Sequence, residues 1–228
     1  MMKFLFFDLD DTLLDFQGAE RLALSATLEE FGIEPTDRVL ARYSAINDAQ
    51  WKRLERGEIT REQVRSLRFT LLFAEFGICC DVAEVNRRYM ENLAARPIYL
   101  EGAEALLETL SKEYRLYLAS NGTAWVQEKR IALCGIGRYF EKIFVSEELG
   151  YNKPDPLFFE KAFAQIPDFC KNEAVMIGDS LTSDIKGGKN AGLCTVWFNP
   201  KGEENQSEIQ PEHTVFSLSE IPPLLKKI

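Results

Sequence analysis

Three aspartates within four positions follow a short apolar run near the start of the chain. Asp8, Asp10 and Asp11 come directly after Phe4-Leu5-Phe6-Phe7. A continuous apolar run of this length is typical of a strand buried on both faces of a parallel sheet, and ligands of such sheets gather at the carboxyl ends of the strands. Like charges this close raise one another's pKa, and a bound cation relieves the repulsion. The cluster predicts a metal-dependent site with one carboxylate free for chemistry. The alternative is a solvated turn, where Asp is common.

Three later segments carry side chains suited to phosphate or metal. They contain Ser120 and Asn121, Lys153, and Asp179 with Asp184. A serine hydroxyl and loop amides can hold phosphate oxygens, and a lysine supplies positive charge to phosphate and to a carboxylate nucleophile. Carboxylates also suit the octahedral oxygen coordination of magnesium. Taken singly, each segment could be an ordinary turn or a helix cap. Their common place at strand ends favours one shared site.

The periodicity predicts an α/β protein with a helical insertion. From about residue 97 short apolar strands alternate with helices, which implies right-handed βαβ units and a parallel sheet that also includes the first strand. Residues from about 16 to 96 have a helical period, with Gly32 and Gly77 as stops and a capping box at Thr60. We therefore expect a Rossmann-like parallel-sheet core of residues 1–15 and 97–228, with residues 16–96 as an inserted all-helical domain.

Composition excludes several classes of function. The net charge of −9 argues against a nucleic-acid polymer as partner, because such proteins carry basic patches. Five scattered cysteines do not resemble a disulfide framework or a zinc site, and His213 is the single histidine. Chemistry is therefore left to carboxylates and lysine. The first apolar run is too short for a secretory signal, and no segment approaches the ~20 apolar residues that span a bilayer. We expect a cytoplasmic protein with no membrane partner.

The four motifs, in this order, resemble those of the haloacid dehalogenase superfamily of aspartate-nucleophile phosphohydrolases. The helical insert directly after the first motif is similar to the helical cap of that superfamily. Two further segments, Gly-Glu-Ile-Thr at 57–60 and Ser-Glu-Glu-Leu-Gly at 146–150, resemble the 5′-nucleotidase branch that acts on pyrimidine nucleoside monophosphates. Dehalogenating relatives lack the second aspartate of the first motif. The presence of Asp10 therefore favours phosphoryl transfer.

The resemblance implies a role for each motif residue. Asp8 would attack phosphorus and form an aspartyl-phosphate, while Asp10 would protonate the leaving oxygen and then deprotonate the hydrolytic water. Mg2+ would be held by the Asp8 carboxylate, the Asp10 backbone carbonyl and Asp179. Asp184 would act on the metal site indirectly, from outside the direct ligands. The side chains expected to cradle the phosphoryl group are those of Thr12, Ser120, Asn121 and Lys153.

The helical insert is expected to select the substrate by closing over the site. Asn47 and Trp51 lie four residues apart on one helix face, where the Trp could stack on a base and the Asn could bond its edge. Core packing is the competing use of Trp51. The expected substrate is a small phosphorylated metabolite, in the first place a nucleoside 5′-monophosphate. Alternatives are phosphoglycolate or a sugar phosphate as substrate, a phosphosugar mutase, and a catalytically silent binding protein. The sequence leaves open the leaving group and whether the protein is a monomer or a dimer.

Overall fold

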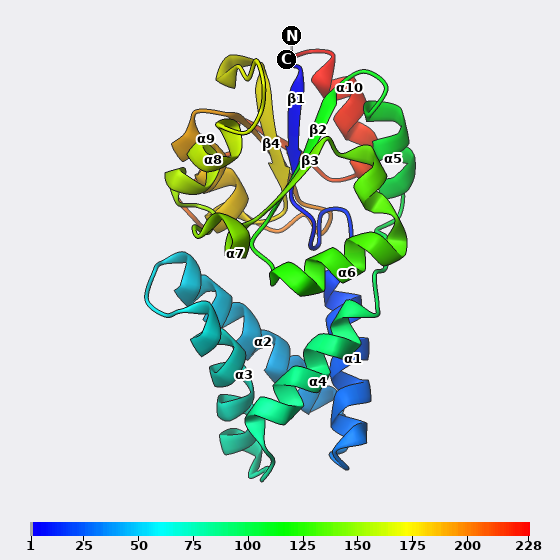
Figure 1. Cartoon of the computed structure of the whole chain (residues 1–228), viewed down its shortest axis with the longest axis vertical. Coiled ribbons are helices and arrows are strands. Elements are labelled where there is room, and N and C mark those ends of the chain that lie inside the picture. Colours follow the sequence, from blue (N-terminus) through cyan, green and yellow to red (C-terminus); the bar gives the residue numbers. More distant parts are fainter. Residues whose placement is uncertain (1) are drawn as a thin grey trace. The chain divides into compact units, whose positions relative to one another are not determined.

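The computed structural model describes residues 2–228 and divides into two compact units. One unit is made of Met1–Asp15 and Tyr99–Ile228, and the other is made of Phe16–Ile98. The second unit is therefore an insertion between the first strand and the rest of the first unit. Colours in Figure 1 follow the chain through both units.

The first unit is built on a six-stranded parallel sheet with the order β3-β2-β1-β4-β5-β6. From β1, at the centre, the chain adds β2 and β3 on one side and β4, β5 and β6 on the other, so the strand order reverses next to β1. The predicted α/β fold with a parallel sheet is confirmed, although the three-residue β6 was not predicted. The strands are β1 (Phe4–Phe7), β2 (Arg115–Ser120), β3 (Lys142–Val145), β4 (Ala174–Gly178), β5 (Cys194–Phe198) and β6 (His213–Val215).

The register of the central strands brings three motifs to one edge of the sheet. Phe7 is level with Leu118 on one side and with Ile177 on the other. The backbone N–H of Asp8 continues this ladder and donates to the carbonyl of Ile177 at 2.9 Å. Asp8, the end of β2 and the end of β4 therefore meet at the same level of the sheet, as the sequence predicts.

Helices cover both faces of this sheet, which is why β1 is continuously apolar. Leu5 and Phe7 belong to a core cluster with residues of α5 and α10, whereas Phe4 and Phe6 pack with α8 on the other face. Figure 1 shows α5 and α10 on one side of the strands and α8 and α9 on the other. The helices of this unit are α5 (Ala103–Leu110), α6 (Ala124–Cys134), α7 (Ser146–Leu149), α8 (Pro156–Phe163), α9 (Lys186–Ala191) and α10 (Ile221–Leu225).

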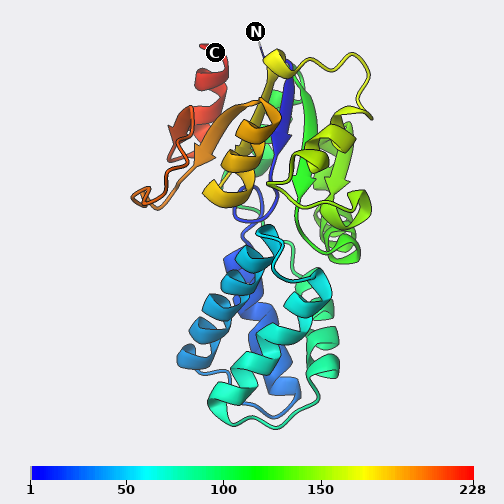
Figure 2. The same ribbon diagram turned by 90° about the vertical axis from the view of Figure 1, so that its left-hand side faces the viewer.

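The inserted unit is all-helical, as predicted, and Figure 2 shows its helices from the side. Its helix ends follow the sequence signals: Thr36 and Asp81 cap two helices, and Gly77 ends a third with a φ of 65°. Thr60 and Gln63 form a complete capping box. The helices are α1 (Phe16–Glu30), α2 (Asp37–Glu55), α3 (Arg61–Phe76) and α4 (Val82–Ala94).

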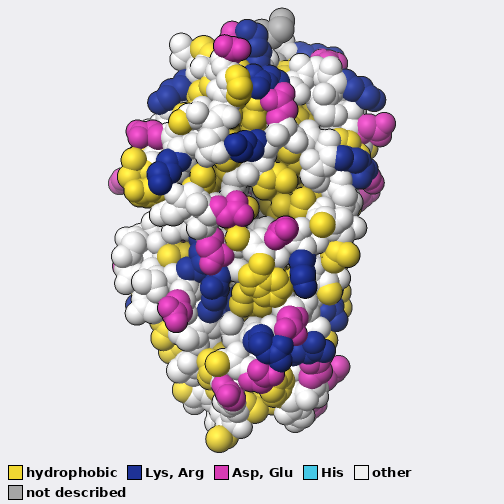
Figure 3. Space-filling view, viewed as in Figure 1, with side chains coloured by type: hydrophobic (Ala, Val, Ile, Leu, Met, Phe, Trp, Pro, Cys, Tyr) yellow, Lys and Arg dark blue, Asp and Glu magenta, His cyan; other side chains and the backbone are white. Residues whose placement is uncertain are grey.

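Basic and acidic side chains are interspersed on the face of the molecule shown in Figure 3. On α4, Arg87 is paired with Glu84 and with Glu91. Such exposed pairs contribute little to stability and leave a mixed, solvated surface. In residues 2–228, no helix has the length and apolar character needed to cross a membrane.

The capping box of α3 gives a prediction for stability. Thr60→Ala removes the hydroxyl that accepts from the Gln63 N–H at 3.2 Å. We expect the free energy of unfolding to fall by about 1 kcal/mol, measured by urea titration followed by circular dichroism. Thr60→Ser, which keeps the hydroxyl, is the control and should stay close to the wild type. Equal losses in the two variants would contradict this role for the hydroxyl.

Candidate active site

A buried lysine lies at the centre of the converging strand ends. The Lys153 ammonium donates to Asp8 Oδ1 at 2.7 Å, to Asp184 Oδ1 at 2.6 Å and to the carbonyl of Ala119 at 2.5 Å. Its side chain is fully buried, and its three N–H donors are all used. One cation therefore joins the ends of β1 and β2 to the turn after β4.

Asn121 holds the backbone of this lysine in place. Its amide nitrogen donates to the Lys153 carbonyl at 2.8 Å, and its amide oxygen accepts from the Lys153 N–H, also at 2.8 Å. The side chain thus binds both backbone polar groups of one residue, as a neighbouring strand would. Asn121 was predicted to bind phosphate, whereas its hydrogen bonds in the structure orient the backbone of Lys153. Its predicted contact with phosphate stays a prediction.

Carboxylate oxygens of Asp8, Asp179 and Asp184 lie within 4.8 Å of one another. Burial raises the pKa of Asp8 to about 8, with Lys153 opposing and Asp184 adding to the rise. Burial and the carboxylates of Asp8 and Asp184 also raise the pKa of Asp179 well above its usual value.

Burial lowers the pKa of the Lys153 ammonium, but Asp184 and Asp8 outweigh this effect and raise it above its usual value. The lysine therefore stays charged, yet it is one cation among three carboxylates. A divalent cation with a preference for oxygen ligands fits this set.

The carboxylates of this cluster differ in how they are already bonded. Asp184 uses one oxygen to accept from Lys153 and the other to accept from the backbone N–H of Ser180 at 3.1 Å. It therefore supports the cluster from a fixed position, and its role outside the direct metal ligands stays a prediction. It lies in a short π-helical turn, Leu181–Ile185, that leads directly into α9.

Asp179 is fixed mainly through its backbone. Its N–H donates to Thr12 Oγ1 at 3.1 Å, and its carbonyl accepts from the indole N–H of Trp197 at 2.7 Å. Thr12 also donates to the Asp179 carboxylate at 3.4 Å. Thr12 is fully buried, and its hydrogen bonds join the loop after β1 to the loop after β4. Its contact with phosphate stays a prediction.

Asp10 and Ser120 are joined through two residues that the sequence analysis did not name. Gln127 Nε2 donates to Asp10 Oδ2 at 2.7 Å and to Ser120 Oγ at 2.8 Å. Arg130 Nη1 donates to Asp10 Oδ1 at 2.5 Å and to Gln127 Oε1 at 3.0 Å. The buried residues of α6 are Val126, Gln127, Arg130 and Ile131. Long polar side chains at helical spacing among apolar positions were the signal that could have found them.

The two residues proposed to select the substrate lie in the inserted unit. Asn47 is buried there: its amide nitrogen donates to Glu20 at 2.7 Å, and its amide oxygen accepts from Arg68 at 3.3 Å. Trp51 is half-buried, packs against a small apolar cluster and lies 5.5 Å below the guanidinium of Arg61. Their contact with substrate stays a prediction.

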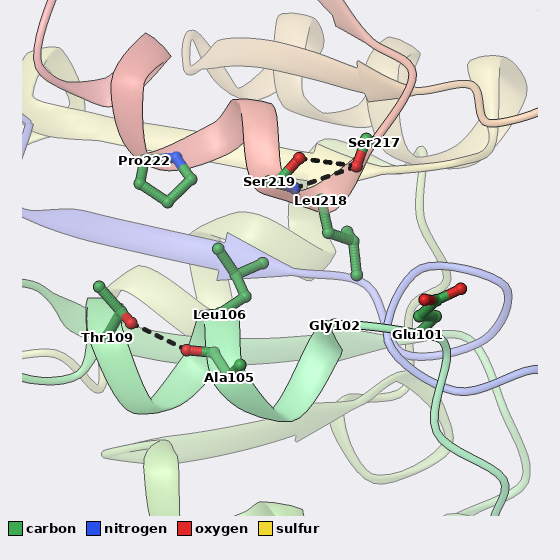
Figure 4. A pocket seen from close by; sticks show the side chains of 9 residues that line it. All are labelled: Glu101, Gly102, Ala105, Leu106, Thr109, Ser217, Leu218, Ser219 and Pro222. Carbon is green, nitrogen blue, oxygen red and sulfur yellow. Dashed lines mark hydrogen bonds between the residues drawn. The ribbon is translucent and has the colours of Figure 1, made fainter.

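A separate cavity of about 640 Å3 lies between α5 and the C-terminal segment (Figure 4). It is lined by Leu106 and Thr109 from α5, by Ser217 and Ser219 from the segment that leads into α10, and by Pro222 of α10. The hydroxyls of Ser217 and Ser219 bond to each other at 2.9 Å. The carboxylate cluster does not line this cavity, so it belongs to a different part of the first unit.

Comparison with known proteins agrees with this arrangement. A model of the haloacid dehalogenase-like hydrolase family matches residues 5–198. The chain belongs to that family. The predicted resemblance is confirmed, and so is the prediction that this protein is a hydrolase. The matched range contains all four motifs of the site.

Three relatives of the hydrolase cover nearly its whole length. It is 43% identical over 226 residues to pyrimidine 5′-nucleotidase PynA of Streptococcus pneumoniae, covering 99% of this chain and 95% of that protein. It is 31% identical to pyrimidine 5′-nucleotidase YjjG of Escherichia coli, covering 98% and 97%. The crystal structure of the putative hydrolase YfnB of Bacillus subtilis, described as bound to magnesium, has a TM-score of 0.94 and 39% identity and covers 98% of each chain.

The raised carboxylate pKa values predict how pH changes the effect of a metal on stability. With the pKa of Asp8 raised to about 8, the cation-free folded hydrolase binds protons that the unfolded chain releases above about pH 4. Its stability therefore falls as pH rises from about 4 to about 8. A divalent cation held by this cluster would bind the ionised carboxylates, so we expect the rise in Tm on adding magnesium to be small near pH 5 and largest near pH 8.

Thermal melts with and without magnesium across this range measure the effect. Asp179→Asn should reduce the rise in Tm at every pH, because the variant has lost one of the clustered carboxylates. Asp81→Asn, at a helix cap in the inserted unit, is the matched control and should leave the rise unchanged. A magnesium effect that is equal at pH 5 and pH 8 would contradict the prediction.

Proposed function

We propose that this hydrolase is a magnesium-dependent phosphatase of small phosphomonoesters, and that nucleoside 5′-monophosphates are its main substrates. The observation that carries the proposal is the Asp8 carboxylate, fixed through one oxygen by the buried Lys153 at the edge of the sheet. A carboxylate held in this way can attack phosphorus with its other oxygen. Asp10, two residues along the chain, has a side chain that is 27% exposed and can exchange a proton with substrate or water.

The reaction has two steps. Asp8 forms a bond to phosphorus while the ester P–O bond breaks, and the leaving oxygen takes a proton from Asp10. A water molecule then attacks the phosphorus of the aspartyl-phosphate and gives a proton back to Asp10, which releases phosphate and restores the Asp8 carboxylate. Ser120, at the end of β2, can donate its hydroxyl hydrogen to a phosphoryl oxygen. Lys153, whose three N–H donors hold Asp8, Asp184 and the Ala119 carbonyl, places a positive charge beside the reacting group.

The residues present fit a magnesium ion. Asp8, the Asp10 carbonyl and Asp179 would hold it, with Asp184 keeping the ligands in place. Bound magnesium would offset the negative charge of the carboxylates and of the phosphoryl oxygens. The clustered carboxylates and the description of the YfnB crystal structure as bound to magnesium support this choice.

The substrate class rests on the relatives. Two of them, PynA and YjjG, are named as pyrimidine 5′-nucleotidases, and the hydrolase covers at least 95% of each. We therefore infer that pyrimidine nucleoside monophosphates are hydrolysed with a higher kcat/KM than purine nucleoside monophosphates, phosphoglycolate or hexose phosphates. Release of inorganic phosphate across such a panel measures this order. A hexose phosphate at the top of the order would contradict the substrate assignment and leave the phosphatase assignment intact.

An Asp→Asn substitution at position 8 tests the proposed nucleophile, and the same substitution at position 11 is its control. Asp8→Asn should lower kcat by at least about 1,000-fold, because the amide is a poor nucleophile. Asp11→Asn is the matched control and should keep activity close to that of the wild type, since Asn tolerates the φ of 57° found at Asp11. Acid quenching during turnover should trap a phosphorylated protein in the wild type and none in Asp8→Asn. Wild-type phosphate release from Asp8→Asn would overturn the proposal.

A proposed role of Trp51 in recognising the base can be separated from packing. Trp51→Leu keeps apolar volume against Leu54 and Ile59 but removes the ring available for stacking. We expect KM for a pyrimidine monophosphate to rise about 10-fold while KM for p-nitrophenyl phosphate stays unchanged. Equal changes for both substrates would show that Trp51 only packs.

A further inference from the structure

Gln127 and Arg130 form a buried connection between Asp10 and Ser120. Both lie on one face of α6 and are 1% exposed, whereas the Asp10 side chain is 27% exposed. Each oxygen of the Asp10 carboxylate accepts from a different donor, Oδ1 from Arg130 and Oδ2 from Gln127. An accessible carboxylate is thus held in one orientation by two side chains that solvent does not reach.

The hydrogen bonds of Gln127 require one orientation of its amide. Its oxygen accepts from Arg130 at 3.0 Å, and its nitrogen has two hydrogens, one for Asp10 and one for Ser120. Turning the amide over would place a nitrogen against the guanidinium and an oxygen against the Asp10 carboxylate. Arg130 therefore fixes Gln127 as a donor toward both of its other partners.

The same bonds direct the hydroxyl of Ser120. Its oxygen accepts from Gln127 at 2.8 Å and from the backbone N–H of Gly122 at 3.1 Å. A hydroxyl has two acceptor lone pairs and one donor hydrogen, so these contacts occupy the lone pairs and leave the hydrogen to be donated. A phosphoryl oxygen bound at the end of β2 is an acceptor for it.

Gly122 provides the space that Gln127 occupies. A Cβ atom at Gly122 would lie 2.2 Å from Gln127 Nε2, which is far inside any permitted contact. A side chain at this position would therefore displace Gln127 from the place where it bonds to Asp10 and Ser120.

We propose that Gln127 and Arg130 are positioning residues for phosphoryl transfer. They hold Asp10 in the orientation that delivers its proton to the leaving oxygen, and Gln127 aims the Ser120 hydroxyl at the phosphoryl group. This inference rests on the proposed function, since that function supplies the role of Asp10 as an acid. The competing explanation is that the two residues only fix α6 against the sheet.

Two substrates whose leaving groups differ in their need for a proton distinguish a positioning role from a purely structural one. Arg130→Met should lower kcat/KM for a nucleoside 5′-monophosphate about 10- to 100-fold, because the alkoxide leaving group needs the proton of Asp10. With p-nitrophenyl phosphate, whose leaving group departs without a proton, the loss should be below about 3-fold. Arg130→Lys should recover part of the lost kcat/KM. Arg138→Met, an exposed arginine shortly after α6, is the control and should match the wild type with both substrates.

A double-mutant cycle shows whether Arg130 acts through Asp10. In the Asp10→Asn background, Arg130→Met should change kcat/KM for the nucleotide by less than about 2-fold, since the group that it positions is already lost.

Gln127→Glu keeps the size of the side chain and replaces the donor by a carboxylate, so it should lower kcat/KM for both substrates. If Arg130→Met does not fold, Arg130→Lys takes its place in both comparisons.

Each outcome bears on one assignment. Equal losses with both substrates in the Arg130 variants, or full losses that persist in the Asp10→Asn background, would overturn the positioning role. An Asp10→Asn enzyme that shows no dependence on the leaving group would overturn the role of Asp10 as the acid in the proposed function. The two failures are therefore distinguishable.

Discussion

The structure of this site depends on the burial of one ammonium group among oxygen atoms. Lys153 reaches Asp8, Asp184 and the Ala119 carbonyl, which belong to three different segments of the chain. Removing one partner of a buried ion pair typically costs about 3–5 kcal/mol, because the other charge is left without compensation. Asp8, Lys153 and Asp184 therefore hold one another in place. The lack of a side chain at Gly178 belongs to the same constraint, since a Cβ there would lie 2.3 Å from the Asp184 carboxylate.

Two aspartates that lie two positions apart in the sequence form ion pairs with different cations. Asp8 is paired with Lys153, which is fully buried, and Asp10 is paired with Arg130 from α6. Carboxylates that share one site would otherwise compete for the same charges. Separate partners suit the proposed mechanism, in which one carboxylate is the nucleophile and the other exchanges protons.

The sequence was sufficient to predict what depends on strand order, but not what depends on side-chain packing. Parallel strands end at one edge, so Asp8, Ser120 and Asp179 could be placed together from their position after apolar runs. The partners of Thr12 and Asn121 could not be predicted in this way. Their groups bond to Asp179 and to the Lys153 backbone through the register of the folded sheet.

The same limit applies within helices. Asn47 and Trp51 share a spacing that suggests one face, yet the structure buries Asn47 against Glu20 and leaves Trp51 partly exposed. The face of a helix that is buried depends on how the neighbouring helices pack against it, and sequence periodicity does not identify those neighbours. Gln127 and Arg130 were missed for the same reason: their spacing gives a face of α6, but only the packed sheet shows that Asp10 lies opposite it.

The turn after β2 connects the two ion pairs. Asn121 fixes the backbone of Lys153, and Ser120 is joined to Asp10 through Gln127. Gly122, the next residue, leaves the room that Gln127 needs. A shift of this turn would therefore disturb the Asp8–Lys153 pair and the Asp10–Arg130 pair at the same time. Coupling through three consecutive residues keeps the two carboxylates in a fixed geometry, which the proposed reaction requires because it uses both of them in each step.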